Sequence, residues 1–421
     1  MFKFLHAADI HLDSPLNKLD SYEGAPVDAI RGATRRAMDN LVQTAIAEKV
    51  AFVLIAGDLN DGDWKDYNTG LHLVSQTARL REAGIPVYIV AGNHDAASKI
   101  TRRLKLPDNV HLFPAEKPGT FTIDDPGVVI HGQSFAKPAV KKDLSIHYPA
   151  SVPGYFNIGL LHTCASGREG HEPYAPCTLE GLESRGYHYW ALGHVNKYET
   201  LMDDPPVIFS GCIQGRHIRE AGPKGCVLVT VDDHHKPEPE FIPLDVIRWT
   251  VARVDATGAE SAYDVVDLFG RQLDVLTDEN AGLPLVVRVV IEGETAGHSE
   301  LLIDVERWCN EIRSAAIDLC GGQVWVEKIK IHTALPASEQ DFQKSEGAIG
   351  ELISIFEEMD SSTERVQALS EEFNDIVKKM PKELKGDSGS HGFDDVDWLS
   401  NLLKQVRPML LKRLARKGVF E

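Results

Sequence analysis

Side chains that bind metal ions follow short apolar stretches in this chain. One apolar run is followed by Asp58, and a later run is followed by Asn93, His94 and Asp95. Uninterrupted apolar runs of this length, bounded by Gly and polar residues, are typical of strands buried on both faces of a parallel sheet. Ligands bind at the carboxyl ends of such strands, and carboxylate, amide and imidazole groups suit a divalent ion. The pattern predicts a metal site at this edge.

The same pattern occurs at three further places. The chain opens on an apolar run followed by Asp9 and His11, whose side chains point the same way on an extended backbone and can reach one ion. Two later apolar runs end on His162 and on His194, and Asn196 stands two residues beyond the second. A single buried histidine is more often hydrogen-bonded in a core than bound to metal. Five such strand ends in one chain favour the metal site.

In order and spacing, these motifs resemble the five-motif pattern of the calcineurin-like metallophosphoesterases. The motifs are Asp9-x-His11, Gly57-Asp58, Gly92-Asn93-His94-Asp95, His162 and Gly193-His194. Within that family, the opening His-Ala-Ala-Asp-Ile-His-Leu-Asp-Ser-Pro resembles the bacterial SbcD-type DNA repair exonucleases, especially their YhaO-like branch. One residue departs from the family pattern. The last motif of the family is Gly-His-x-His, and Asn196 stands in place of the second histidine.

The resemblance implies two divalent metal ions, Mn²⁺ above all, that share one carboxylate. One ion would be held by Asp9, His11, Asp58 and Asn196, and the other by Asp58, Asn93, His162 and His194. Because an amide oxygen donates less strongly than imidazole to a borderline metal ion, Asn196 should weaken the first site.

Three residues beside the ligands are expected to support the reaction. His94 would be the acid that protonates the leaving sugar oxygen or stabilises the developing charge. Asp61 and Asp95 would orient the metal ligands.

The net charge of -19 over 421 residues argues against a protein that coats nucleic acid by bulk electrostatics. A local basic strip near the metal edge could still hold a phosphate backbone. The predicted DNA-binding residues are Arg102, Arg103, Arg216, His217 and Arg219. For each of them, a place on a solvated surface remains the alternative.

Composition predicts a soluble cytoplasmic protein with no attachment to a membrane. No apolar run approaches the roughly 20 residues that span a bilayer, and the amino terminus lacks a basic region followed by an apolar one. The six cysteines are scattered without a Cys-x-x-Cys pair, which fits reduced thiols.

Residues 1–245 are predicted to form the catalytic domain. Helical patterns over 28–48 and 69–83 link the first three strands in β-α-β-α-β order, which implies a parallel core. Segments 120–123, 128–132, 207–211 and 226–231 are predicted to form strands of a second sheet. The expected fold is an α/β (α+β) metallophosphoesterase two-sheet sandwich flanked by helices.

Two further regions follow the catalytic domain. Residues 246–335 again show a β-α-β-α-β order, so we expect a small α+β domain, and the resemblance implies a capping domain that restricts the access of DNA. A module that only stabilises the fold is the alternative. Residues 336–421 carry apolar helical stripes and a basic end. The resemblance implies a helical region that binds the coiled-coil root of an SbcC-like ATPase, and ordinary core packing is the alternative.

The resulting hypothesis is a metal-dependent DNA exo- and endonuclease subunit, a homodimer that acts with an SbcC-like ATPase in DNA repair. A scaffold that binds DNA or its partner through a weakened metal site stays open, because Asn196 replaces a ligand histidine. A phosphodiesterase for small molecules is disfavoured, since it would need neither the cap nor the terminal helices.

Overall fold

The computed structural model describes residues 1–14, 30, 32–60, 67–97, 105–165, 174–336, 354–358, 362, 365–369, 398–404 and 406. The predicted site residues Asp61, Arg102 and Arg103 lie outside this described part. The chain forms two compact units. The first comprises Met1–Val251, Thr277–Arg288 and Gln323–Glu327, and the second comprises Ala252–Leu276, Val289–Gly322 and Lys328–Glu421.

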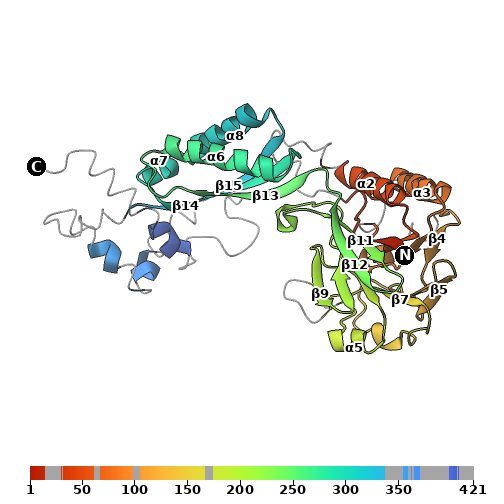
Figure 1. Ribbon diagram of the computed structural model, residues 1–421. Coiled ribbons are helices and arrows are strands. Elements are labelled where there is room, and N and C mark those ends of the chain that lie inside the picture. The colour runs from red at the N-terminus through yellow and green to blue at the C-terminus, as the bar shows by residue number, and fades with distance from the viewer. Residues whose placement is uncertain are drawn as a thin grey trace, which may run out of the picture. The chain divides into compact units, whose positions relative to one another are not determined.

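The first sheet of unit 1 has the strand order β12-β11-β1-β2-β3-β4. Four strands are parallel: β1 (Phe2–Ala7), β2 (Phe52–Ile55), β3 (Val87–Ile89) and β4 (Val110–Leu112). Helices α2 (Ala33–Ala47) and α3 (Tyr67–Glu82) connect β1 to β2 and β2 to β3, and they lie side by side (Figure 1). The predicted parallel core and its two crossover helices are confirmed.

Two antiparallel strands, β11 (Gly225–Val231) and β12 (Pro237–Pro243), complete the first sheet beside β1. The prediction that 226–231 continues the second sheet is therefore wrong. The nearly continuous apolar run marks 226–231 as a strand, but pairing with β1 is a contact between segments more than 200 residues apart. Local pattern carries no information about that partner.

The second sheet has the order β5-β6-β7-β8-β10-β9. Its strands are β5 (Gly119–Ile123), β6 (Val128–Gly132), β7 (Phe156–His162), β8 (Tyr189–Gly193), β9 (Glu199–Asp203) and β10 (Pro206–Phe209). The inner four, β6, β7, β8 and β10, are parallel. Short helical turns complete this unit: α4 (Asn93–Ala97), η2 (Ser145–His147), α5 (Leu179–Glu183) and η3 (Ile218–Glu220).

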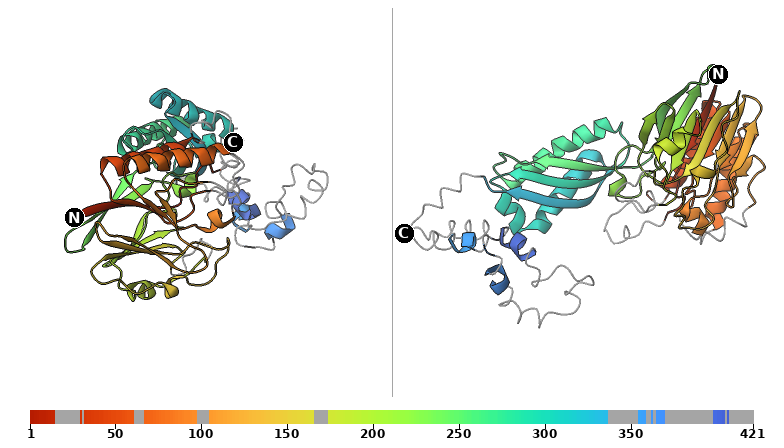
Figure 2. Two further views of the ribbon diagram at one scale, coloured as in Figure 1. Left: turned by 90° about the vertical axis from the view of Figure 1, so that its right-hand side faces the viewer. Right: turned by 90° about the horizontal axis from the view of Figure 1, so that it is seen from below.

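The two sheets pack face to face around a buried aromatic core. The ring of Phe4 stacks on Phe52 in the same sheet at 5.0 Å and meets Tyr189 of the second sheet edge-on at 5.3 Å. Because strand residues alternate between faces, Leu5 and Val53 point instead toward the helices. The α/β two-sheet sandwich flanked by helices is thus confirmed (Figure 2).

A separate three-stranded sheet, β13-β14-β15, follows in the chain. Its strands are β13 (Arg248–Asp255), β14 (Leu285–Glu294) and β15 (Val324–Ala334), and its helices are α6 (Ala262–Glu279), α7 (His298–Ile303) and α8 (Val305–Cys320). Asp304 caps α8 by accepting a hydrogen bond from the Arg307 amide, and Gly321 ends the helix with φ at 56°. The three predicted strands and the first predicted helix are present, but the second predicted helix is divided at Asp304 into α7 and α8.

Three short helical pieces of the carboxyl-terminal region are described. Phe356, Val366 and Leu399 are buried in them, whereas Ile355 is 47% exposed. At the three buried positions the apolar stripe is covered by other parts of the chain, so the described parts of the stripe are not fully open. Among the described residues, no helix is both long and apolar enough to cross a bilayer.

Candidate metal centre

The loops that leave β1 and β2 run side by side at the carboxyl edge of the first sheet. The amide of Asp9 donates to the carbonyl oxygen of Gly57, and the amide of His11 donates to that of Asp58, both at 3.0 Å. Asp9, His11 and Asp58 have φ values of 49°, 45° and 52°. Residues other than Gly seldom adopt this left-handed region, and such strain is concentrated at functional sites. The ligand-type residues of both strands therefore converge in a conformation that the surrounding loops enforce.

Asp58 lies at the centre of the cluster. Its Oδ2 atom is 3.6 Å from Nε2 of His162 and 4.0 Å from Nε2 of His11. Its Oδ1 atom accepts a hydrogen bond from the His94 amide at 2.9 Å. Two sets of potential ligands share this carboxylate: Asp58 with His11 and His94, and Asp58 with His162 and His194, each within 4.8 Å. This is the arrangement that the predicted bridging role of Asp58 requires.

His162 presents an unprotonated nitrogen to the site. Its Nδ1 lies 2.9 Å from the carbonyl oxygen of Ala56, which can only accept, so Nδ1 carries the proton. The Nε2 lone pair then faces Oδ1 of Asn93 at 3.0 Å. Burial lowers the pKa of His162 to about 4 and keeps the ring neutral. Two acceptor atoms at this distance repel each other unless both bind the same cation. The His162 nitrogen and the Asn93 oxygen therefore fit ligands of the predicted metal ion.

Asp9 and Asn196 are placed differently from the predicted first ligand set. Both carboxylate oxygens of Asp9 accept from the His194 amide, at 3.1 and 2.9 Å, and Asp9 belongs to neither potential ligand set. The backbone oxygen of Asn196 accepts from Lys224, while its buried Oδ1 has no hydrogen-bond partner among the described residues. A buried amide oxygen without a donor is uncommon and fits a ligand role. The second predicted ligand set is brought together more completely than the first.

Buried negative charge also fits a bound cation. Burial and the nearby charge of Asp58 raise the pKa of Asp9 well above its ordinary value. Burial and the charge of Asp95 raise the pKa of Asp58 to about 7. Carboxylates in such a site are ionised only with a compensating positive charge, which a divalent ion supplies.

Two glycines of the motifs permit the close approach of these groups. A Cβ atom on Gly92 would lie 2.3 Å from Oδ1 of Asp58, and one on Gly193 would lie 2.0 Å from the carbonyl oxygen of Ala56. Real Cβ atoms do not approach so closely, so any side chain here would displace the loops that carry the ligands. Gly92 and Gly193 are therefore steric requirements of the site.

Asp95 connects the two ligand loops, and its predicted role in orienting the ligands stays a prediction. Its Oδ2 accepts from the amides of Leu59 and Gly92 at 3.2 and 3.1 Å, and its Oδ1 accepts from the Asn60 amide at 3.0 Å and its side-chain nitrogen at 3.3 Å. Burial raises the pKa of Asp95, and the backbone donors act in the opposite direction. The carboxylate thereby ties the residues after Asp58 to the turn that carries Asn93 and His94.

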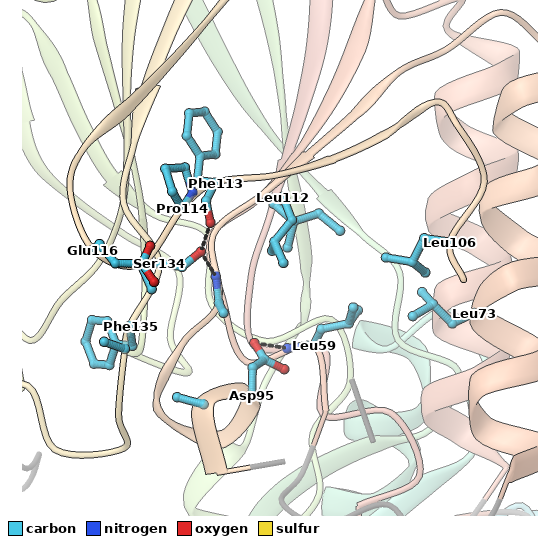
Figure 3. A pocket seen from close by; sticks show the side chains of 15 residues that line it. Leu59, Leu73, Asp95, Leu106, Leu112, Phe113, Pro114, Glu116, Ser134 and Phe135 are labelled. Atoms are coloured by element: carbon cyan, nitrogen blue, oxygen red, sulfur yellow. Dashed lines mark hydrogen bonds between the residues drawn. The ribbon is translucent and has the colours of Figure 1, made fainter. Parts of the chain in front are cut away.

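Two aromatic side chains that the sequence patterns did not single out line the site. Phe135 meets the His162 ring edge-on at 5.3 Å, and Tyr174 meets the His194 ring at 5.7 Å. Phe135 and Asp95 also border an apolar cavity of about 490 Å³ (Figure 3). The Asp95 carboxylate and the Ser134 hydroxyl on its wall are engaged in hydrogen bonds within the protein. No predicted metal ligand lines this cavity.

A second carboxylate near the first motif, Asp13, was also missed. Asp13 accepts from the Arg35 guanidinium, with Nε at 2.8 Å, and from the hydroxyl of Thr69. It thus fastens the loop after β1 to α2 and α3. Its spacing, two residues after His11, was the only available signal.

The described members of the predicted DNA-binding set lie on one turn. The side chain of Arg216 is 13% exposed and is paired with Glu220 at 2.6 Å. His217 is 55% exposed, 3.6 Å from Glu220, and Arg219 is exposed. Contact of these residues with DNA stays a prediction.

Comparison with known proteins identifies the family. Residues 2–198 match the calcineurin-like phosphoesterase model, and residues 249–334 match the model "Metallophosphoesterase YhaO, middle domain". The uncharacterized metallophosphoesterase YhaO of Bacillus subtilis is 37% identical over 295 residues, 69% of this chain and 71% of that protein.

Two further proteins are more distantly similar to this chain. The DNA double-strand break repair protein Mre11 of Sulfurisphaera tokodaii is 27% identical over 328 residues, 72% of this chain and 77% of that protein. A dimetal phosphatase from Danio rerio matches with a TM-score of 0.34 and 12% identity, over 56% of this chain and 98% of that structure, a likeness too slight to support a conclusion. From the family match and the YhaO relative, this chain belongs to the calcineurin-like phosphoesterases and is a metallophosphoesterase.

Proposed function

We propose that this metallophosphoesterase is a DNA nuclease that hydrolyses phosphodiester bonds in DNA repair. The observation that carries the proposal is the position of Asp58, whose Oδ2 stands between the imidazoles of His11 and His162. A carboxylate shared in this way suits two ions that act on one phosphate group. The choice of DNA as substrate is supported by the similarity to the Mre11 protein of Sulfurisphaera tokodaii.

Two divalent ions, Mn²⁺ in our proposal, would be held by Asp9, His11, Asp58, Asn93, His162, His194 and Asn196. When bound, such a pair of ions activates a water molecule and neutralises charge on the phosphate oxygens. The neutral ring of His162 and the amide oxygen of Asn93 offer lone pairs without adding net charge.

His94 is the proposed acid. Its backbone amide is fixed to Asp58, and its ring lies 4.9 Å from the ring of His11. From this position it can protonate the leaving sugar oxygen or stabilise charge on it. The same position also allows His94 to act as a ligand, because its ring completes a set with His11 and Asp58.

The test combines elemental analysis with DNA hydrolysis. Protein loaded with Mn²⁺ should retain two ions and degrade short single-stranded or nicked DNA, and Asp58→Ala should lose both properties. If the protein hydrolyses only small phosphate esters and leaves every DNA substrate intact, the nuclease proposal is wrong.

The second candidate function is a scaffold that binds DNA or a partner through a weakened metal site. Two observations favour it: Asp9 stands outside both sets of potential ligands, and Asn196 supplies an amide where the family has imidazole. Asn196→His should raise both Mn²⁺ affinity and nuclease activity, because imidazole is the better donor. Equal activity of the two forms at saturating Mn²⁺ would show that Asn196 is no defect.

We further propose that the protein is a cytoplasmic homodimer and that its two later regions have different roles. Residues 246–335 restrict the access of DNA to the site, and residues 336–421 bind an SbcC-like coiled-coil ATPase. Deletion of 345–417 should leave a folded, metal-binding nuclease that the ATPase no longer stimulates. Unfolding of the deleted protein would instead assign the stripe to core packing, consistent with the burial of Phe356, Val366 and Leu399.

A further inference from the structure

Arg216 is held in one orientation by Glu220. Its Nε and one terminal nitrogen donate to the two carboxylate oxygens at 3.2 and 2.6 Å, and its backbone amide donates to the same carboxylate at 2.8 Å. The side chains of Arg216 and Glu220 are 13% and 4% exposed. Buried ion pairs contribute little net stability, because both charges lose their hydration. Net stabilisation of the fold therefore does not explain the Arg216–Glu220 pair.

The segment that carries Arg216 is fixed next to the metal edge. Cys212 pairs in parallel with Ala8, the residue before Asp9. The side chain of Gln214 donates to the carbonyl oxygen of Ile247 at 2.6 Å, and the Trp249 indole donates to that of Gly215 at 3.1 Å. These bonds leave the backbone of Arg216 little freedom.

The segment also contacts the loop that carries the last ligand motif. The Cys212 thiol and the Lys224 ammonium group, on either side of Arg216 in the chain, both donate to the carbonyl oxygen of Asn196, at 3.5 and 2.9 Å. Burial alone would raise the pKa of Glu220, but its hydrogen bonds and charge pairing with Arg216 outweigh burial and lower it. Both partners are therefore charged, and the guanidinium is a preorganised cation beside the site.

We propose that Arg216 contacts a non-bridging oxygen of the phosphate during hydrolysis, and that Glu220 is the positioning residue that fixes its guanidinium. This inference rests on the proposed hydrolysis of phosphodiesters. A planar guanidinium matches the oxygens of a phosphate, and donors fixed in advance stabilise the charge that develops there. His217, whose Nε2 lies 3.6 Å from Glu220, and Arg219 are exposed, whereas Arg216 is largely buried.

The test uses four variants and one matched control. Arg216→Gln removes the positive charge, and Arg216→Lys keeps the charge but removes the planar guanidinium. Glu220→Gln weakens the pairing that holds the guanidinium, and a double variant combines Arg216→Gln with Glu220→Gln. Arg288→Gln is the control, because Arg288 forms a similar two-bond pair with Glu327 at 2.9 and 2.7 Å outside the site. Metal content, kcat and KM on bis(4-nitrophenyl) phosphate and DNA, and the Kd of inorganic phosphate by calorimetry are measured for each.

Arg216→Gln should lower kcat by about 10²-fold, the scale for one lost donor to developing charge, and should weaken phosphate binding with unchanged metal content. Arg216→Lys and Glu220→Gln should show smaller losses. The double variant should be no worse than Arg216→Gln, because Glu220 acts only through Arg216. The Arg288→Gln control should leave all these values unchanged.

Three results would overturn the inference: loss of metal in Arg216→Lys, additive losses in the double variant, or phosphate binding that does not depend on Arg216. Each would assign the pair to folding or to the metal ligands. Activity on bis(4-nitrophenyl) phosphate distinguishes failure of this inference from failure of the nuclease proposal. If the unaltered protein cleaves the diester but not DNA, the substrate assignment fails, while the test of Arg216 proceeds on the diester.

Discussion

Replacement of Asp95 by Asn tests whether the metal site depends on the link between its two ligand loops. The carboxylate accepts four hydrogen bonds, two at each oxygen, and is 6% exposed. An amide keeps one acceptor oxygen and turns an NH₂ group toward two N–H donors. Hydrogen bonds to a charged group contribute roughly 1.5–3 kcal/mol each, so loss of two should lower the free energy of unfolding by about 3 kcal/mol or more.

The same replacement should weaken metal binding although Asp95 touches no ion in the predicted ligand sets. Loss of a residue that orients ligands typically lowers metal affinity by about 10–100-fold. Urea unfolding of the metal-free protein measures the first effect, and Mn²⁺ titration measures the second. Asp232→Asn is the control, since Asp232 also accepts two backbone hydrogen bonds, from His234 and Lys236, but in an exposed hairpin. Native Mn²⁺ affinity in Asp95→Asn would refute the reasoning.

Further predictions concern Asp58, His94 and His6. Asp58→Ala should remove both ions and all hydrolysis, and retention of two metal equivalents in elemental analysis would contradict the bridging assignment. His94→Ala should keep metal and DNA binding while turnover falls by roughly 10²-fold or more, and parallel loss of metal would make His94 a ligand instead. His6 is fully buried between Tyr189 and the carbonyl oxygen of Leu192, and burial lowers its pKa to about 3. Because the unfolded chain binds a proton near pH 6.5 and the folded chain does not, stability should fall from pH 6.5 toward pH 3, by up to roughly 1.4 kcal/mol per pH unit. Urea midpoints of the metal-free protein should show a smaller acid loss in His6→Gln, and an equal loss would assign the effect to other groups.

The amino-acid sequence by itself determined the strands and the residues at their ends. Apolar runs of four to seven residues mark buried strands because such strands contact other layers on both faces. The carboxyl ends of neighbouring parallel strands share one edge, so the pattern alone assigns Asp58 and Asn93 to one site. His162 ends a strand of the second sheet, and only the resemblance to the family assigned it to the same site. The crossover helices followed from apolar periodicity for the same local reason.

Tertiary structure alone decided which distant groups meet. The pairing of β11 with β1, the proton on Nδ1 of His162 and the contact of Asp9 with the His194 amide each join segments more than 100 residues apart. Such contacts depend on how the two sheets pack, which no local pattern records. The pairing of Arg216 with Glu220 spans only four residues, but the position of this segment next to the loop after β1 depends on the bridge between Cys212 and Ala8. The sequence could therefore nominate the ligands, whereas the charge around them and their orientation arise from packing between distant parts of the chain.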